Sequence, residues 1–168
     1  MEFFDVVRAR RSIRAFAARS VEPEKLTKIL DAANRAPSAG NLQAYEIFAV
    51  KSREALRALA QGRDCFEVIP LALVFCANRA RAAERFGKRG AELYCVQDAT
   101  IACAYAQLAA TALGLSSVWV GRFDEDIVRR AIGAPEDLLP VAILPIGHAA
   151  ETPEIKSRRA LQDLVRSV

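Results

Sequence analysis

The sequence predicts an α+β fold in which helices surround a mostly antiparallel sheet of four to five strands. Four short segments are rich in apolar residues, many of them branched or aromatic, as strands are: residues 45–51, 71–77, 116–121 and 140–147. The helical segments do not alternate regularly with these strands, as they would in a doubly wound parallel sheet. The 168 residues suffice for one domain with a full core, so we expect a single domain over residues 1–168.

Two helices are predicted before the first strand. The first spans about residues 2–11, and the second spans about residues 23–36. Pro23 suits the first turn of the second helix, and apolar residues then recur at helical spacing until Pro37. The apolar face of the first helix consists of Phe3, Val6 and Val7.

Further helical segments follow the first strand. Two short helices are predicted over residues 54–61 and 124–133. The basic segment 79–90 is interrupted by Gly87 and Gly90, which predicts a mobile helix–loop excursion. Residues 91–113 are apolar almost all round, so we expect a helix that is buried on every side, by its own domain or by a partner subunit.

One uncharged stretch, residues 99–121, is long enough to cross a bilayer. It contains Gln107 and a polar break at residues 114–117, and alanine predominates over leucine. We therefore expect a buried helix that ends near residue 113 and is followed by a strand, and no membrane partner.

Composition excludes several classes of function. The net charge of +4 comes mainly from arginine, and this mild excess favours a small anionic ligand over a nucleic-acid partner. The four cysteines form no CxxC pair and there is one histidine, so no metal site is expected. The N-terminal residues do not have the pattern of a signal peptide, and the expected location is cytoplasmic.

The common catalytic motifs are absent. The sequence contains neither GxGxxG after a strand nor GxxxxGK[ST], so it supports neither a Rossmann site nor a P-loop. The single histidine, His148, stands beside a strand end with no serine–aspartate partners to mark a triad. The acidic residues lie mainly on solvated helix faces, which gives no pair of carboxylates for acid–base hydrolysis.

Two basic clusters remain as candidate anion sites. The segment "RARRSIRAF" contains Arg8, Arg10, Arg11 and Arg14, with the Ser12 hydroxyl among them. Arginines at a helix C-terminus can simply neutralise its dipole, although four exceed that need. The second cluster, residues 156–159, follows the last strand and could instead be a solvated tail. If the two clusters converge, their guanidinium groups would hold a phosphate.

Two other segments are candidates for lining a ligand. The segment "APSAGNLQ" at residues 36–43 combines small residues with Asn41 and Gln43, whose amides both donate and accept hydrogen bonds. The same residue types also make an ordinary loop after a helix. Gly121 ends the third predicted strand, where it would let the backbone approach a flat ligand or would simply form a turn.

The motifs resemble those of the FMN-dependent nitroreductase family, in the same order and over nearly the whole chain. "RRSIRAF" is similar to the opening motif of that family, and "APSAGNLQAYEI" is similar to its Pro-Ser-x-x-Asn-x-Gln segment. "ALGLSSVWVG" resembles the glycine-ended strand beside the flavin. The stretch from "LPVAILPIG" to "KSRR" resembles the closing strand and the phosphate-binding tail.

The resemblance implies a nitroreductase-like obligate homodimer with FMN at the subunit interface. It places Arg10, Ser12 and Arg14 against the phosphate, ribityl chain and pyrimidine side of FMN, with Arg11 in the same cofactor-binding segment. Lys156 and Arg158 would complete the phosphate site. The backbone amides of Val120 and Gly121 would face the flavin N5 and O4 atoms. The residues that would come from the other subunit are Pro37, Ser38, Ala39 and Asn41.

The implied reaction is a ping-pong transfer in which NAD(P)H reduces FMN and a small oxidised acceptor, such as a nitroaromatic or a quinone, reoxidises it. No catalytic side chain is implied, because the flavin supplies the chemistry. Two alternatives remain: a flavoenzyme of the same fold that acts as a dehydrogenase or consumes flavin, and a non-catalytic flavin-binding protein. The sequence departs from the family at Ala44-Tyr45, where Pro-Trp is common. Before the second strand it offers only Arg63 and Asp64 for the pyrimidine edge.

Overall fold

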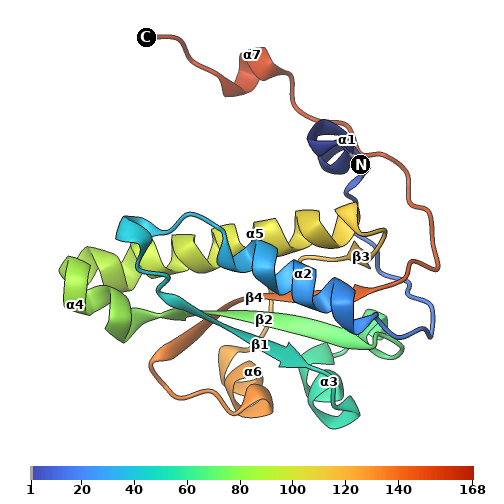
Figure 1. The fold of residues 1–168 in the computed structure, drawn as a ribbon, viewed down its shortest axis with the longest axis horizontal. Coiled ribbons are helices and arrows are strands. Elements are labelled where there is room, and N and C mark those ends of the chain that lie inside the picture. The colour runs from blue at the N-terminus through green and yellow to red at the C-terminus, as the bar shows by residue number, and fades with distance from the viewer. Residues whose placement is uncertain (1) are drawn as a thin grey trace.

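The computed structural model describes residues 2–168 and contains one four-stranded antiparallel sheet (Figure 1). The strands lie in the order β1-β2-β4-β3, and each pairs antiparallel with its neighbours. Their bounds are Tyr45–Val50 for β1, Leu71–Asn78 for β2, Ser116–Ser117 for β3 and Leu138–Gly147 for β4. The predicted α+β class and antiparallel sheet are confirmed.

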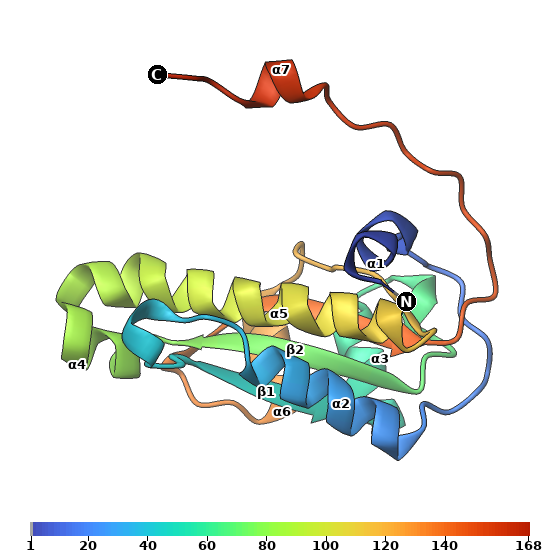
Figure 2. The same ribbon diagram turned by 45° about the horizontal axis from the view of Figure 1, so that its top comes forward.

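Helices cover both faces of this sheet. Helices α2 (Pro23–Asn34) and α5 (Cys95–Ala112) lie on one face, and α3 (Arg53–Ala60) and α6 (Glu125–Ile132) lie on the other (Figures 1 and 2). The remaining helices and helical turns are α1 (Phe3–Ala9), α4 (Arg79–Arg89), α7 (Leu161–Leu164), η1 (Ala39–Asn41), η2 (Asp64–Phe66) and η3 (Gly90–Tyr94).

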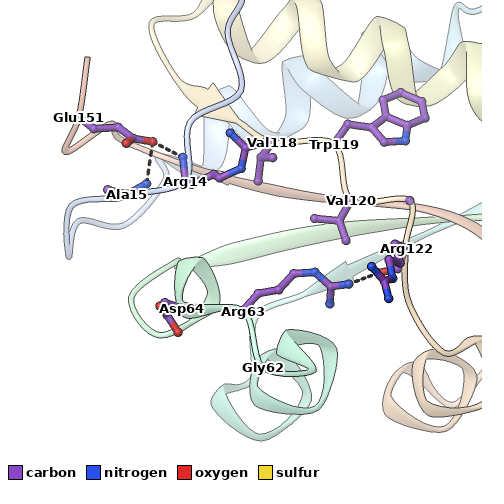
Figure 3. Close-up of a pocket in the computed structure, with 11 residues that line it drawn as sticks. Arg14, Ala15, Gly62, Arg63, Asp64, Val118, Trp119, Val120, Arg122 and Glu151 are labelled. Atoms are coloured by element: carbon purple, nitrogen blue, oxygen red, sulfur yellow. Dashed lines mark hydrogen bonds between the residues drawn. The ribbon is translucent and has the colours of Figure 1, made fainter. Parts of the chain in front are cut away.

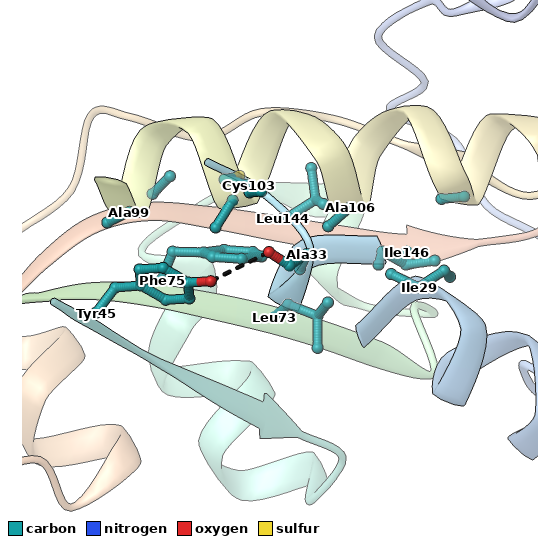
Figure 4. Packing of buried hydrophobic residues seen from close by; sticks show 14 of the residues in the cluster. Ile29, Ala33, Tyr45, Leu73, Phe75, Ala99, Cys103, Ala106, Leu144 and Ile146 are labelled. Atoms are coloured by element: carbon teal, nitrogen blue, oxygen red, sulfur yellow. Dashed lines mark hydrogen bonds between the residues drawn. The ribbon is translucent and has the colours of Figure 1, made fainter. Parts of the chain in front are cut away.

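The sheet divides the core into two parts, and the inner strand β2 contributes side chains to both. Successive side chains of a strand point to opposite faces, so Leu73 and Phe75 pack towards α2 and α5, and Val74 packs towards α3 and α6. All three are fully buried. On the α2 side, the Tyr45 hydroxyl donates a hydrogen bond to the Ala33 carbonyl at 3.2 Å (Figure 4). This bond satisfies the one polar atom that Tyr45 carries into an apolar core.

The third strand is much shorter than predicted. Only Ser116–Ser117 forms a strand, and pairing resumes at one bridge between Val120 and Ile143. In this register Val118 lies opposite Pro145, which has no N–H to donate to its neighbour. The prediction of a continuous strand over residues 116–121 is therefore wrong, because a proline in β4 interrupts the ladder.

The segment 79–90, predicted to be a helix–loop excursion, is helical over most of its length and has its break at Gly87, with φ 58° and ψ −147°. The Asn78 side chain caps a helix by accepting the Arg81 N–H at 2.9 Å, and α4 then runs into α5 through the five-residue π-helical turn η3. Gly90 permits this tight connection, because a Cβ atom there would lie 2.4 Å from the Ala82 carbonyl oxygen. Before the break at Gly87, α4 has helical geometry, so it presents side chains such as Arg81 and Arg85 to its neighbours at fixed positions.

The long helix α5 is buried on its sheet side only. Its small residues Ala99, Cys103 and Ala106 are fully buried against the sheet, whereas Tyr105 is 41% exposed. The prediction of burial on every side is therefore not met within one chain. No helix among residues 2–168 is long and apolar enough to span a membrane.

Apolar side chains are also exposed at both ends of the chain. Of the predicted apolar face of α1, only Val6 is buried, and Phe3 and Val7 face solvent. After β4 the chain leaves the two layers of helices and runs outside the rest of the molecule (Figure 2). The exposed apolar residues of this tail are Ile155, Leu161, Leu164, Val165 and Val168.

Candidate functional site

The arginine-rich segment 10–16 lies between β3 and the chain that leaves β4. Ser12 forms a parallel bridge with Ser117, and the Ile13 N–H donates to the Ser117 carbonyl at 3.1 Å. Four residues after Ser12, Phe16 pairs antiparallel with Ala149. These backbone bonds fix the segment along the edge of the sheet, so Arg14, which lies between them, projects from a backbone held on both sides.

The Glu151 carboxylate adds a second anchor for this segment. It accepts hydrogen bonds from the backbone N–H groups of Arg14 and, at 3.0 Å, Ala15 (Figure 3). These two bonds stabilise the charged form and lower the pKa of Glu151 below its ordinary value, against an opposing effect of partial burial. No feature of the sequence identified this residue, since its partners lie more than 130 positions earlier in the chain.

We expect acid to weaken this anchor. The pKa of Glu151 is lowered by folding, so its contribution to stability is complete above the ordinary value of 4.5 and is lost as pH falls through the folded value. The free energy of unfolding of the natural chain should therefore fall more steeply as pH falls below about 5 than that of Glu151→Gln, whose amide stays neutral. Urea unfolding of both proteins across this range measures the difference. Parallel pH profiles would contradict the assignment.

A cavity of about 620 Å³, here called the Trp119 cavity, opens beside Glu151. It is lined on one side by Arg14 and on another by the backbone and side chains after β3 (Figure 3). Its lining residues are Arg14, Ala15, Gly62, Arg63, Asp64, Val118, Trp119, Val120, Gly121, Arg122 and Glu151. Most of this lining is apolar or backbone, which suits a flat, largely apolar group.

Arg63 closes one side of the Trp119 cavity. Its guanidinium donates to the Ala60 carbonyl at 3.0 Å and to the Arg122 carbonyl (Figure 3). Next to it, the Gln61 side chain accepts the Asp124 N–H at 2.8 Å. The loop after α3 is thus fastened to the loop after Gly121, and the guanidinium that sequence reasoning offered to a ligand is bonded to the protein backbone.

The two amides predicted to face a ligand differ in the structure. The Val120 N–H donates to the Ile143 carbonyl at 2.9 Å, so it is not free and the expectation for this amide is not met. The bridge to Ile143 is the physical reason. The Gly121 N–H has no hydrogen-bond partner among residues 2–168. A Cβ atom at Gly121 would meet only the Trp119 indole, at 3.7 Å, so there is open space at this position.

A second cavity, of about 700 Å³, brings the two basic clusters together and is here called the arginine cavity. Its only acidic lining residue is Glu154. Its other lining residues are Val7, Arg8, Arg10, Arg11, Ser12, Arg14, Pro153, Ile155, Lys156 and Arg158. Such a concentration of cations beside one hydroxyl suits an anion with several acceptor oxygens.

Arg11 provides a more specific indication that this region binds a ligand. Its Nε atom is buried and has no hydrogen-bond partner in the described part of the chain. A buried donor that is left unpaired is costly, and such atoms are usually satisfied by protein, water or ligand. The arginine cavity therefore offers both charge and an unsatisfied donor.

Arg14 lines both cavities, so a ligand could extend from one into the other. The combined site suits a molecule with an anionic group at one end and a flat ring at the other. Pro37, Ser38, Ala39 and Asn41 line neither cavity. They lie near the opposite end of α5, beside α4 (Figures 1 and 2).

The model of the nitroreductase family matches residues 7–64 and 62–148 of the chain. The chain belongs to the nitroreductase family. The FMN reductase [NAD(P)H] of Bacillus subtilis is 32% identical to this family member over 164 residues, which cover 88% of this chain and 66% of the relative. The crystal structure of a nitroreductase family protein from Clostridium difficile 630 superposes with a TM-score of 0.88 and 33% identity, covering 99% of this chain and 98% of that one.

A further solved structure, of an FMN-dependent nitroreductase from Clostridium difficile R20291, superposes on this nitroreductase-family chain with a TM-score of 0.79. It is 30% identical and covers 92% of this chain and 91% of that one. The prediction that the chain is an oxidoreductase of the nitroreductase family is confirmed.

The residues of the two cavities fit FMN. The phosphate would find the cations of the arginine cavity, one of which, Arg11, carries the unpaired Nε, and the ring would find the open backbone at Gly121 in the Trp119 cavity. Within the described part of the chain, no group of histidine, cysteine or acidic side chains could hold a metal ion.

Proposed function

We propose that this nitroreductase-family chain is an FMN-dependent NAD(P)H oxidoreductase that reduces small oxidised acceptors such as nitroaromatics and quinones. The observation that carries the proposal is that the cationic arginine cavity and the Trp119 cavity, with its apolar and charged lining, meet at Arg14. The name of the Bacillus subtilis relative, FMN reductase [NAD(P)H], supports both the cofactor and the electron donor.

Each group of residues has a distinct role in this proposal. Arg10, Arg11 and Ser12 bind the FMN phosphate and the adjoining ribityl chain, and Lys156 and Arg158 complete the phosphate site from the tail. Arg14 lies where the two cavities meet, so it places a positive charge beside the pyrimidine side of the ring. The free N–H of Gly121 is available to the ring edge, whereas Val120 contributes apolar contact.

When bound, FMN supplies the redox chemistry, accepting a hydride from NAD(P)H and passing electrons to the acceptor in a ping-pong sequence. The chain binds and orients, and no side chain is assigned as a catalytic acid or base. A positive charge beside the pyrimidine side favours the reduced ring, on which negative charge develops. The apolar lining of the Trp119 cavity excludes water from one side of the ring.

The protein acts as a homodimer in this proposal, with Pro37, Ser38, Ala39 and Asn41 of one copy covering the FMN held by the other. Two observations support it. This segment lies far from both cavities within one chain. Apolar side chains also remain exposed on α1, on Tyr105 of α5 and along the tail, and large exposed apolar areas mark association surfaces.

The cytoplasm is the proposed location. The side chains of Cys76, Cys95 and Cys103 are unpaired thiols, which is the state that a reducing compartment maintains. Burial raises the pKa of all three thiols, so they are poor nucleophiles and have no part in the proposed reaction.

Steady-state oxidation of NADH and NADPH, followed at 340 nm with a quinone or a nitroaromatic as acceptor, tests the proposed reaction. We expect acceptor-dependent turnover and parallel lines in double-reciprocal plots, as a ping-pong sequence requires. Oxidation of NAD(P)H that proceeds only with free flavin in substrate amounts would indicate a flavin-consuming enzyme. Bound flavin that reoxidises slowly and independently of the acceptor would indicate a non-catalytic flavin protein. Either result would contradict the proposal.

A further inference from the structure

The turn formed by residues 38–43 has an unusual backbone. Gly40, Asn41 and Gln43 all have positive φ angles, of 54°, 53° and 52°. Glycine adopts this left-handed region freely and asparagine tolerates it, so Gln43 is the strained residue of the three. Strained backbone persists only where its surroundings hold it, and it is concentrated at functional sites.

Helix α4 holds this turn from outside. The Arg81 Nε donates to the Leu42 carbonyl at 2.8 Å, and the Arg85 Nη1 donates to the Gly40 carbonyl at 3.0 Å. The contact at Gly40 is close, because a Cβ atom there would lie 3.0 Å from the Phe86 ring and 3.1 Å from the Arg85 guanidinium. The basic residues of α4 that the sequence suggested were part of an excursion thus bind two carbonyl groups of the turn.

Helix α5 also holds this turn, through the side chain of Asp98. The Asp98 Oδ1 accepts the Ala39 N–H at 3.0 Å, and Asp98 is only 3% exposed. Its Oδ2 atom has no partner among the described residues. Within the turn, the Ser38 hydroxyl accepts the Gln43 N–H at 3.0 Å. Side chains therefore satisfy backbone groups at four of the six residues of the turn. Three of these side chains come from outside the turn, two from α4 and one from α5.

We propose that Arg81, Arg85 and Asp98 are positioning residues that hold the turn 38–43 in the strained shape with which it covers the flavin of the second copy. This inference rests on the proposed function, since it assigns the turn the role given there. None of the three side chains touches FMN in this account. They act by fixing the backbone of the turn residues that touch FMN.

The test compares three double variants of the full chain. Arg81→Ala with Arg85→Ala removes both donors to the turn, and Arg81→Lys with Arg85→Lys keeps a donor at each position. Arg79→Ala with Lys88→Ala removes the same charge from exposed positions of α4 that do not bond to the turn. Amide hydrogen exchange of the FMN-free proteins and titration with FMN, followed by flavin fluorescence, are the two measurements.

We expect the alanine pair to raise exchange at residues 39–43 by about tenfold and to weaken FMN binding by a similar factor, at a thermal midpoint close to that of the natural chain. The lysine pair should restore both values, and the control pair should change neither. Exchange that is equal in the alanine pair and the control would overturn the inference, whatever the affinity for FMN. Failure of the natural chain to bind FMN would overturn the proposed function, and with it the role given to the turn.

Discussion

Replacing Arg10 and Arg158 together by alanine should weaken FMN binding by about a hundredfold. The two arginines come from opposite ends of the chain and line the same cavity. A hydrogen bond to a charged group contributes about 1.5–3 kcal/mol, and partial exposure favours the lower end of this range. Two such bonds then amount to about 3 kcal/mol, which corresponds to two orders of magnitude in the dissociation constant. Titration of the apoprotein with FMN measures the change.

A matched variant separates the site from general charge effects. Lys28→Ala with Arg166→Ala removes two positive charges from exposed positions outside the arginine cavity. This control should bind FMN almost as tightly as the natural chain does. Any small loss of affinity would reflect long-range attraction between the removed charges and the phosphate, and added salt should abolish it. An equal loss of affinity in the control pair, or full affinity in the Arg10 and Arg158 pair, would show that the arginine cavity is not the phosphate site.

A second large effect, on FMN binding, is expected when two chains with different defects are combined in one dimer. A chain with Arg10→Ala and Arg158→Ala has an impaired cation cluster, and a chain with Gly40→Val has a disrupted turn, because Gly40 has a positive φ and close neighbours. Each alone should bind FMN weakly. In mixed dimers isolated through two different tags, the intact cluster of one chain faces the intact turn of the other. One high-affinity site per dimer should therefore return, and FMN titration of the mixed dimer measures it.

The opposite arrangement is the control. All three substitutions are placed in one chain, which is then paired with a natural chain. If FMN binds between chains, each of the two sites now has one defective half, and no high-affinity site should remain. If instead the cluster and the turn served one site within a single chain, this arrangement would keep one site, and the previous arrangement would keep none. The pair of results therefore distinguishes a shared site from a self-contained one.

The sequence could predict the elements whose local pattern agrees with their tertiary environment. The segment around Val74 is uniformly apolar and forms a strand buried on both faces, and Pro23 begins a helix with regular apolar spacing. The third strand was predicted too long because its interruption depends on Pro145, which lies in a different strand. Pairing between distant segments is not visible in the pattern of either segment alone.

The same reason limits what the sequence could predict of the site. The two basic clusters are conspicuous, and the structure brings Arg10, Arg11, Arg14, Lys156 and Arg158 to one cavity. Glu151, which holds the backbone of Arg14, has no local signal. Arg81 and Asp98 are equally inconspicuous, because they bond to a turn that lies 39 and 59 positions away in the sequence. Residues that position others are recognisable only after the chain has folded.

The most direct test of the central claim, that the two joined cavities hold FMN, is the visible absorption spectrum of the purified protein before and after denaturation. The chromophore that denaturation releases is then identified and quantified. We predict the spectrum of a bound flavin and the release of about one FMN per chain, as one site for each arginine cavity requires. A colourless protein that also takes up no added FMN would contradict the account, and the cations around Arg11 would then require a different anion.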